Sequence, residues 1–341
     1  ESGSKVIVHN AIAGKNVSIA SGFHHMEIKE GTTYETTNRV LGLDKISVDE
    51  NGELVVGVNS DLSVISNVLM PNTVLAAVSG EKGIGVDRIN DLLSVYNGLE
   101  HAEVEKALNS IALMGVAGGA QTIAVNTADM IQDTLNLHGS KLASYDHEKA
   151  GPDLWIDVNG SFSKANDYSV GIAKYGYKSD LTGVTIGGDY ALGNGVAAGL
   201  AVSLGKGSVR GQGNGSGVKN DIDYYGINLY GVANTPFVNL IGTIGYLQSK
   251  NEIKQMGFKG KPDAKTFSIG VRAEKPLALN DRITVTPHIG VKYVHTKLDS
   301  LSAGGLTYKA DKANLVQVPF GVAFNANLEA PCGAKVKPFI D

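Results

Sequence analysis

The chain has 341 residues, 43% of them hydrophobic, and a formal net charge of −4. Its length suffices for two or three structural units, and its charge gives none of the basic excess with which proteins bind nucleic acid. No apolar run is long enough for a membrane-spanning helix. Membrane-spanning strands are not excluded by this, because every second residue of such a strand is polar.

From the residues at its two ends we expect the chain to be a piece of a longer protein. The first residues, Glu1-Ser2-Gly3, are not part of the apolar stretch that a signal peptide needs. The last expected strand stops soon after it starts, so we also expect further strands beyond it. The single cysteine, Cys332, lies in an expected turn and excludes an intrachain disulfide.

Residues 1–80 predict short strands at intervals of about ten residues, a spacing typical of all-β units. Turn residues such as Asn51-Gly52 separate them. This spacing fits the stacked coils of a β-solenoid, which we favour, or a small β-sandwich. The expected strands are 6–8, 17–20, 26–29, 46–48, 54–58 and 62–68.

Residues 87–145 change to a helical period. Asp87 is a suitable N-cap for a first helix, apolar residues between 104 and 112 predict a second, and Gly118-Gly119 predicts a break before a third helix over 120–145. The third helix has only a thin apolar stripe, so we expect it to lie in a polar, water-lined tube. Its polar face comprises Asn126, Asp129, Gln132, Asp133 and Asn136.

From residue 154 onward apolar and polar residues alternate, which predicts strands with two unlike faces. In the segment 282–299, for example, Ile283 and Val285 fall on one face, and Thr284 and Thr286 on the other. A soluble sandwich would alternate in the same way. The expected strands are 154–165, 181–192, 196–205, 221–233, 237–253, 265–279, 282–299, 314–329 and 334–341.

The connections between these strands alternate between long and short. A transmembrane barrel has short turns on the periplasmic side and longer loops outside, whereas a sandwich has no reason to sort its loops by side. We therefore expect an antiparallel barrel. The long gaps are 166–180, 206–220, 254–264 and 300–313, and the short ones are 193–195, 234–236, 280–281 and 330–333.

Two further sets of residues fit a barrel, because polar side chains face its lumen and aromatic rings favour the membrane interfaces. We expect Asp129 and Asp133 of the helix to pair with Arg272 and Lys292, with simple hydration of each charge as the alternative. The expected lumen residues are Asp157, Arg272, Glu274, His288 and Lys292. The expected interface aromatics are Trp155, Tyr190, Tyr224, Tyr225, Tyr230, Tyr246, Phe267 and Tyr293.

The order of these parts resembles the autotransporters of type V secretion. The similarity is most specific in Leu154-Trp155-Ile156-Asp157-Val158, in 177–190, in 219–226 and in Gly245-Tyr246. It covers residues 87–341 well and 1–86 loosely. The resemblance implies that 1–86 is the C-terminal end of a passenger domain (36–80 being similar to the part that assists passenger folding), that 87–150 is a linker with a pore helix at 120–145, and that 151–341 is a translocator barrel truncated at its C-terminus.

The fold class implied is all-β with a helical linker: a transmembrane antiparallel barrel with about 8–9 of the family's twelve strands. The resemblance implies a monomeric barrel in the outer membrane of a Gram-negative bacterium. It would export its own passenger and anchor it at the cell surface, with the barrel-assembly machinery, periplasmic chaperones and outer-membrane lipid as partners. The family's last strands are missing here, and 87–145 lacks the adjacent asparagines at which some relatives cut themselves.

We expect no enzyme, metal or cofactor. His24, His25 and Glu27 come without a suitably spaced further ligand. We also expect neither a Ser–His–Asp nor an Asp–His constellation at the ends of the expected strands. The alternative function is a passive, porin-like channel with a periplasmic N-terminal domain. The activity of the passenger, and whether it is cleaved, do not follow from these residues.

Overall fold

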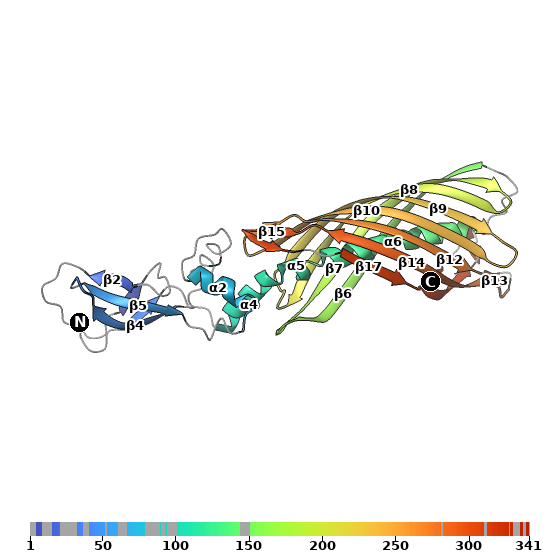
Figure 1. Cartoon of the computed structure of the whole chain (residues 1–341). Helices are drawn as coiled ribbons and strands as arrows, with labels where there is room; N and C mark the ends of the chain where they lie inside the picture. Colours follow the sequence, from blue (N-terminus) through green and yellow to red (C-terminus); the bar gives the residue numbers. More distant parts are fainter. Residues whose placement is uncertain are drawn as a thin grey trace.

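Most of the chain from residue 101 onward forms an open antiparallel sheet that curls around one long helix (Figure 1). The computed structural model describes residues 5–8, 16–20, 33–36, 41–51, 53–60, 67–78, 89, 93, 101–143, 151–280, 282–309, 312–326, 328–329, 335–336 and 339–340. Within these residues the sheet runs in the order β21-β18-β14-β12-β10-β9-β8-β7-β6, and β6 and β21 are its edges. The expectation of an incomplete antiparallel barrel after a pore helix is confirmed.

The large sheet is built from long strands, each antiparallel to its neighbour. Its strands are β6 (Gly151–Val170), β7 (Ala173–Gly193), β8 (Val196–Gly213), β9 (Lys219–Asn234), β10 (Asn239–Gln255), β12 (Asp263–Glu274), β14 (Ile283–Leu298), β18 (Phe320–Ala326) and β21 (Phe339–Ile340). Short strands beside this path are β11 (Phe258–Gly260), β13 (Leu277–Ala278), β17 (Lys312–Gln317), β15 (Leu301–Ala303), β16 (Leu306–Tyr308), β19 (Leu328–Glu329) and β20 (Lys335–Val336).

The prediction of long loops at one end of the barrel is wrong. Residues 166–180 and 206–220 mostly extend β6, β7, β8 and β9, and 300–313 contains the β15–β16 hairpin. Their polar, glycine-rich composition gave no strand signal, but backbone pairing with an adjacent strand needs no particular side chain. The opposite end keeps its tight turns, as at Asn194-Gly195, where both residues have positive φ (53° and 74°).

Two predicted strands are interrupted where proline removes a backbone donor. The segment 314–329 divides into β17 and β18 around Pro319, and 265–279 divides into β12 and β13 before Leu277, next to Pro276. The turn at 330–333, with Cys332, lies outside the described residues.

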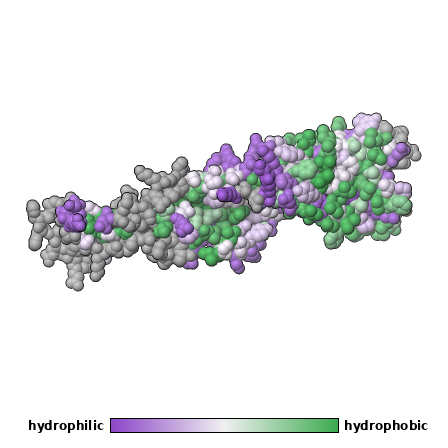
Figure 2. All heavy atoms as spheres, in the orientation of Figure 1, coloured by the Kyte–Doolittle hydropathy of each residue, from purple (hydrophilic) through white to green (hydrophobic). Residues whose placement is uncertain are grey.

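The strands are longer than a bilayer requires. At about 3.3 Å per residue the 16 residues of β9 span roughly 53 Å, whereas about 9–11 tilted residues cross the hydrocarbon core. The outward side chains of β8 are apolar from Val196 to Leu204 and polar from Lys206 to Gln212. Figure 2 shows the resulting band of hydrophobic residues at one end of the barrel. The other end, which carries the hairpins, extends beyond this hydrophobic band (Figure 1 and Figure 2).

The helices precede the sheet and end inside it. They are α2 (Pro71–Val78), α4 (His101–Ala112), α5 (Met114–Ala117) and α6 (Ala120–Ala143). The predicted break at Gly118-Gly119 is present, with Gly119 at φ +61°, and the predicted helix 120–145 is α6 over its described part. Among the described residues no single helix is long and apolar enough to cross a membrane, although Ala102–Ala112 and Met114–Ala143, bent by 64°, pass that test as a pair.

The first 60 residues contain small sheets. β1 (Lys5–Val8) pairs in parallel with β3 (Thr33–Thr36), and β5 (Leu54–Ser60) lies between β2 (Asn16–Ala20) and β4 (Leu41–Val48). The predicted strands 6–8, 17–20, 46–48 and 54–58 fall within these elements, whereas 67–68 form a turn and bend, and α2 was not predicted. The segments 26–29 and 62–66 and the proposed cap Asp87 lie outside the described residues, and a solenoid remains a prediction.

Candidate functional site: the occupied lumen

Helix α6 lies against the inner face of the sheet and contacts strands from β6 to β14. Alternation along the strands places Asp157, Arg272, Glu274, His288 and Lys292 on this inner face, as the sequence predicts. On the helix, Gln132 and Asn136 are buried, Asn126 and Asp129 are partly buried, and Asp133 is exposed. The lumen therefore holds both sets of predicted polar residues, on facing surfaces.

An ion pair joins the middle of the helix to the barrel wall. Lys292 Nζ of β14 donates to Asp129 Oδ1, and Gln317 Nε2 of β17 donates to Asp129 Oδ2 at 3.3 Å. The predicted pairing of Asp129 with Lys292 is thus present, and Arg272 Nε contacts Glu274 Oε2 of its own strand at 3.2 Å. The Lys292 side chain is 7% exposed, so little water competes for its charge.

A neutral polar network holds the other side of the helix. Asn159 Nδ2 of β6 donates to Thr134 Oγ1 of α6 at 3.2 Å and to Thr185 Oγ1 of β7 at 3.0 Å. Thr185 Oγ1 in turn lies 2.9 Å from Ser203 Oγ of β8. Short hydroxyl and amide side chains suit a narrow lumen because they satisfy buried polar atoms without much volume.

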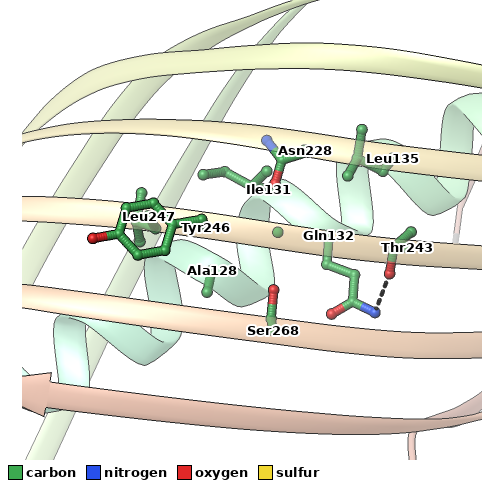
Figure 3. A pocket seen from close by; sticks show the side chains of 10 residues that line it. Ala128, Ile131, Gln132, Leu135, Asn228, Thr243, Tyr246, Leu247 and Ser268 are labelled. Carbon is green, nitrogen blue, oxygen red and sulfur yellow. Dashed lines mark hydrogen bonds between the residues drawn. The ribbon is translucent and has the colours of Figure 1, made fainter.

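Between α6 and strands β9, β10 and β12 the lumen is nearly filled, so that part of it differs from the water-lined tube that the sequence predicts. A cavity of about 10 Å³ remains between α6 and strands β9, β10 and β12, close to the least that one water molecule needs. Figure 3 shows Ile131 and Gln132 of the helix at this cavity, with Gln132 Nε2 donating to Thr243 Oγ1 at 2.9 Å. The inward residues of the sheet bury Gln132 and Asn136 of the polar face of α6 together with its apolar stripe, because the strands curl closely around this side of the helix.

A cluster of rings clamps the C-terminal end of the helix. His138 Nε2 donates to Asp189 Oδ2 at 2.7 Å, Tyr230 Oη donates to the same oxygen at 2.8 Å, and Trp155 Nε1 donates to Tyr230 Oη at 2.6 Å. The His138 ring also stacks on Trp155 with centroids 4.3 Å apart. Close by, Ser140 Oγ donates to Glu274 Oε2 at 2.6 Å.

This cluster shows that three predicted interface aromatics face the lumen instead. Trp155, Tyr224 and Tyr230 lie on the inner face of the sheet, and the two tyrosines are buried. Alternation contained the signal: Trp155 shares the parity of Asp157, and the adjacent Tyr224 and Tyr225 must face opposite sides. Tyr190, Tyr225, Tyr246, Phe267 and Tyr293 do face outward. Their place at a membrane interface stays a prediction.

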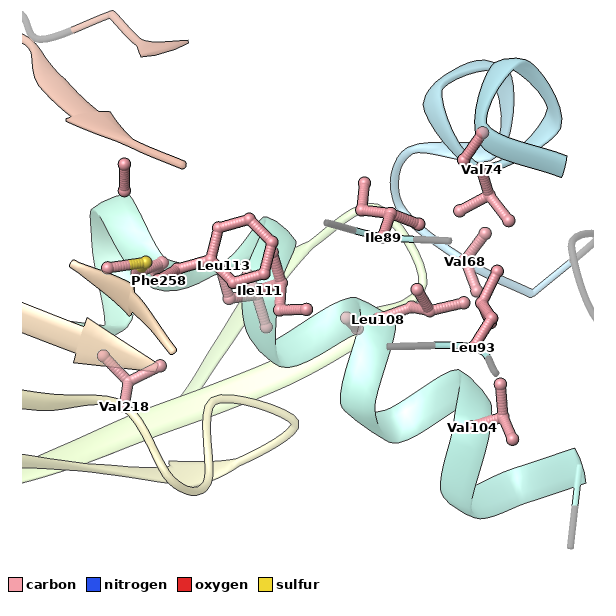
Figure 4. Close-up of a cluster of buried hydrophobic side chains, with 14 of the residues drawn as sticks. Val68, Val74, Ile89, Leu93, Val104, Leu108, Ile111, Leu113, Val218 and Phe258 are labelled. Atoms are coloured by element: carbon pink, nitrogen blue, oxygen red, sulfur yellow. The ribbon is translucent and has the colours of Figure 1, made fainter. Parts of the chain in front are cut away.

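At the hairpin end, the linker before α6 packs against the barrel. Figure 4 shows Ile111 and Leu113 of the linker in a buried cluster with Val218 and Phe258 of the barrel. Tyr308 Oη of β16 donates to the backbone oxygen of Ile111 at 2.6 Å. The cluster continues to Val56 and Val74 in the N-terminal part. It was not predicted, because its members come from segments distant in the chain.

The helix runs from one end of the sheet to the other. At the hairpin end Asn220 Nδ2 donates to the backbone oxygen of Gly118 at 2.8 Å, and at the opposite end Asn234 Nδ2 donates to that of Ala143 at 3.2 Å. The 24 residues of α6 span about 36 Å, enough to cross a hydrocarbon core of about 30 Å.

Nothing in the described part of the chain is arranged to bind a metal ion, since it contains no group of three or more suitable histidine, cysteine, aspartate or glutamate residues. In the His138–Asp189 pair, Asp189 also accepts a hydrogen bond from the phenol of Tyr230, which is not a serine or cysteine nucleophile. The candidate site is therefore a curled sheet with a helix inside it.

A family model described as Autotransporter beta-domain matches residues 154–341, more than half of the chain. The chain belongs to the autotransporter beta-domain family. It is the outer-membrane translocator part of a type V autotransporter of a Gram-negative bacterium, which confirms the resemblance. The translocators of this family are transporters.

Two curated relatives are also outer-membrane proteins. Over 149 residues, 39% of the chain, this autotransporter is 28% identical to outer membrane protein A of Rickettsia rickettsii and to that of Rickettsia conorii. It spans 7% of the length of those relatives.

Among solved structures, the translocator domain of the autotransporter NalP from Neisseria meningitidis has 14% identity and a TM-score of 0.45, covering 61% of this chain and 72% of that one. The beta domain of the Bordetella autotransporter BrkA has 17% identity and a TM-score of 0.40, covering 56% and 76%.

Proposed function

We propose that this part of the autotransporter anchors a passenger at the cell surface by keeping α6 in the lumen after export. The observation that carries the proposal is the path of the helix: the chain before it emerges at the hairpin end, and β6 begins at the short-turn end. A chain that passes once through the lumen connects two compartments. Residues 1–86, as the end of the passenger, would then lie outside, with 87–150 as linker and 151–341 as barrel.

The contacts of α6 support a stable plug. Its middle is held by the pair between Asp129 and Lys292, and its C-terminal end by the cluster around His138. The direct hydrogen bonds and the small cavity leave little room for water between α6 and strands β9, β10 and β12. We infer that the translocator carries out no chemistry, and that the barrel-assembly machinery and periplasmic chaperones are its assembly partners.

The buried cluster at the hairpin end supports a role in passenger folding. Val56 and Val74 belong to one apolar cluster with Phe258, so the passenger end can bury apolar surface on the barrel as soon as it emerges. This agrees with the folding-assistance role expected for residues 36–80. Folding of the passenger outside would then bias the direction of movement.

Protease treatment of intact host cells tests the proposal. An antibody against residues 1–35 of the native protein should lose its epitope while the barrel survives and a periplasmic control protein stays intact. Protection of the epitope until the outer membrane is permeabilised would place the N-terminal part in the periplasm. The passive channel would then replace the proposed function.

A further inference from the structure

A row of basic residues crosses the outer surface of the barrel at its hairpin end. Lys164 is the direct cross-strand neighbour of Lys178, Lys178 of Arg210, and Arg210 of Lys219. All four side chains are exposed on the outward face. We call these four residues the basic row, and at about 4.8 Å between strands it is roughly 14 Å wide.

This arrangement is unfavourable for the barrel alone. Directly opposed residues of adjacent strands lie about 5 Å apart, and like charges in that position repel. In the part of the chain that the structure describes, no member of the basic row forms an ion pair. Asp180 and Asp221 lie one outward position nearer the membrane, and Asp221 instead pairs with Lys254 at 3.1 Å.

Four other lysines at this end each lie beside a carboxylate, unlike the members of the basic row. Glu252 lies within 3.1 Å of Lys254, Lys259 and Lys261, and these contacts hold the pKa of Glu252 at about 2. Lys206 has Asp223 at 3.8 Å. Carboxylates are therefore supplied to those lysines but not to the basic row.

The row also begins at the membrane and rises from it. Lys164 is two residues beyond Phe162, which is 78% exposed, whereas Lys219 is six residues beyond Tyr225, or roughly 20 Å along the strand. Figure 2 shows hydrophilic residues gathered beside the hydrophobic band. A phospholipid headgroup carries one phosphate and covers only part of such a row, so we expect a partner that carries more than one anionic group.

A hollow of about 340 Å³ adjoins the lower end of the row. It is formed where a bulge shifts the register of β6 after Ala165, and its lining includes Lys164, Lys174, Asn166, Asp167 and Gln212. Amide and carboxylate groups match the hydroxyls of a sugar, while the two ammonium groups match phosphate. A phosphorylated sugar therefore suits this hollow better than a plain anionic lipid.

We propose that the basic row and this hollow bind a phosphate-bearing glycolipid of the outer leaflet. The proposal rests on the proposed function, since it needs the hairpin end to lie outside the cell. Binding to detergent-solubilised protein, however, does not depend on orientation. Failure of the protease experiment and failure of lipid binding can therefore be told apart.

The test compares two variants of the full chain refolded in nonionic detergent. One replaces Lys164, Lys178, Arg210 and Lys219 by glutamine. The matched control replaces Lys206, Lys254, Lys259 and Lys261 by glutamine, which removes the same charge from the same end at positions that already face carboxylates. The probes are bisphosphorylated lipid A, its dephosphorylated form, and phosphatidylglycerol, each in mixed micelles.

We expect the basic-row variant to bind lipid A at least about tenfold more weakly than the wild type, and the control to lose less than about threefold. Lipid A should raise the melting temperature of the wild type, as a ligand of the folded state does, but not that of the basic-row variant. Equal losses in both variants, or equal binding of dephosphorylated lipid A, would overturn the proposal. Equal binding of phosphatidylglycerol would overturn the assignment to a glycolipid.

Should the fourfold variant not refold, Lys178→Gln with Arg210→Gln replaces it. Its control is Lys254→Gln with Lys259→Gln. The expected loss for the row pair is about half that of the fourfold variant on a logarithmic scale, since each basic residue near an anionic surface contributes a similar amount. A row pair that loses no more than its control pair would contradict the proposal in the same way.

Discussion

Replacing Asp129 by asparagine removes the charge that joins α6 to β14. Breaking a fully buried ion pair from one side costs about 3–5 kcal/mol, whereas an exposed pair contributes below about 1 kcal/mol. The Lys292 side chain is 7% exposed and that of Asp129 is 29% exposed, which places this pair between the two cases. We expect a loss of about 2 kcal/mol in the seating of the helix, which is roughly a 30-fold change in equilibrium constant.

Two measurements on the protein produced in its own outer membrane check this expectation. Single-channel recording in planar bilayers should show a rise in the open fraction, of about 30-fold if displacement of the helix opens the lumen. Thermal unfolding of the purified protein should shift to a lower temperature. Lys141→Gln is the matched control, because Lys141 is an exposed charge on the same helix.

A double variant separates the pair from its surroundings. Lys292→Met alone should also destabilise the helix, but adding it to Asp129→Asn should cost less than the sum of the two single changes, because both remove the same interaction. Additive costs, or an Asp129→Asn variant that behaves like Lys141→Gln in both assays, would refute the role of this ion pair in holding the plug.

Three further predictions concern the clamp and the hairpins. Tyr230→Phe removes one buried and one partly buried hydrogen bond and should lower the free energy of unfolding by about 2 kcal/mol. Tyr225→Phe, on the exposed face, should change it by less than about 0.5 kcal/mol, and thermal melts that fail to separate the two variants would contradict the clamp. Phe258→Ala should lower the free energy of local unfolding at the hairpin end by about 3–5 kcal/mol and so expose the linker to limited proteolysis. Phe267→Ala, at an outward position, should not do so. Equal cleavage of both variants would count against the role of the buried cluster. Contacts with lysines lower the pKa of Glu252 to about 2, so its contribution to the stability of the hairpin is full above about pH 4.5 and is lost as the pH falls toward 2. Limited proteolysis at a series of pH values should show this dependence in the wild type, and Glu252→Gln should abolish it. A wild-type hairpin that is equally resistant at both ends of the series would exclude the effect.

The sequence predicted the sides of the strands better than their lengths. Alternation placed Arg272 and Lys292 on the inner face because neighbouring side chains of a strand must point in opposite directions. The same rule also contained the correct side for Trp155 and Tyr230. The preference of aromatic rings for membrane interfaces does not override this alternation, and both rings form hydrogen bonds inside the lumen.

The ends of the strands were not predictable in this way. Residues 166–180 and 206–220 have few β-branched or apolar residues, yet they continue the sheet because the adjacent strands offer unpaired backbone groups. Local composition shows only the intrinsic secondary-structure preference of a segment. Pairing between strands is decided by which segments become neighbours.

The sequence by itself determined the class of fold, the antiparallel order of the strands, the break at Gly118-Gly119 and the helix that follows it, since all of these depend on residues near one another in the chain. Only the tertiary structure decided which charge meets Asp129, why Tyr230 lies beside His138, and how Phe258 joins the cluster with Val56. These contacts join segments far apart in sequence. Their partners are fixed by the curvature and register of the whole sheet, which no local pattern encodes.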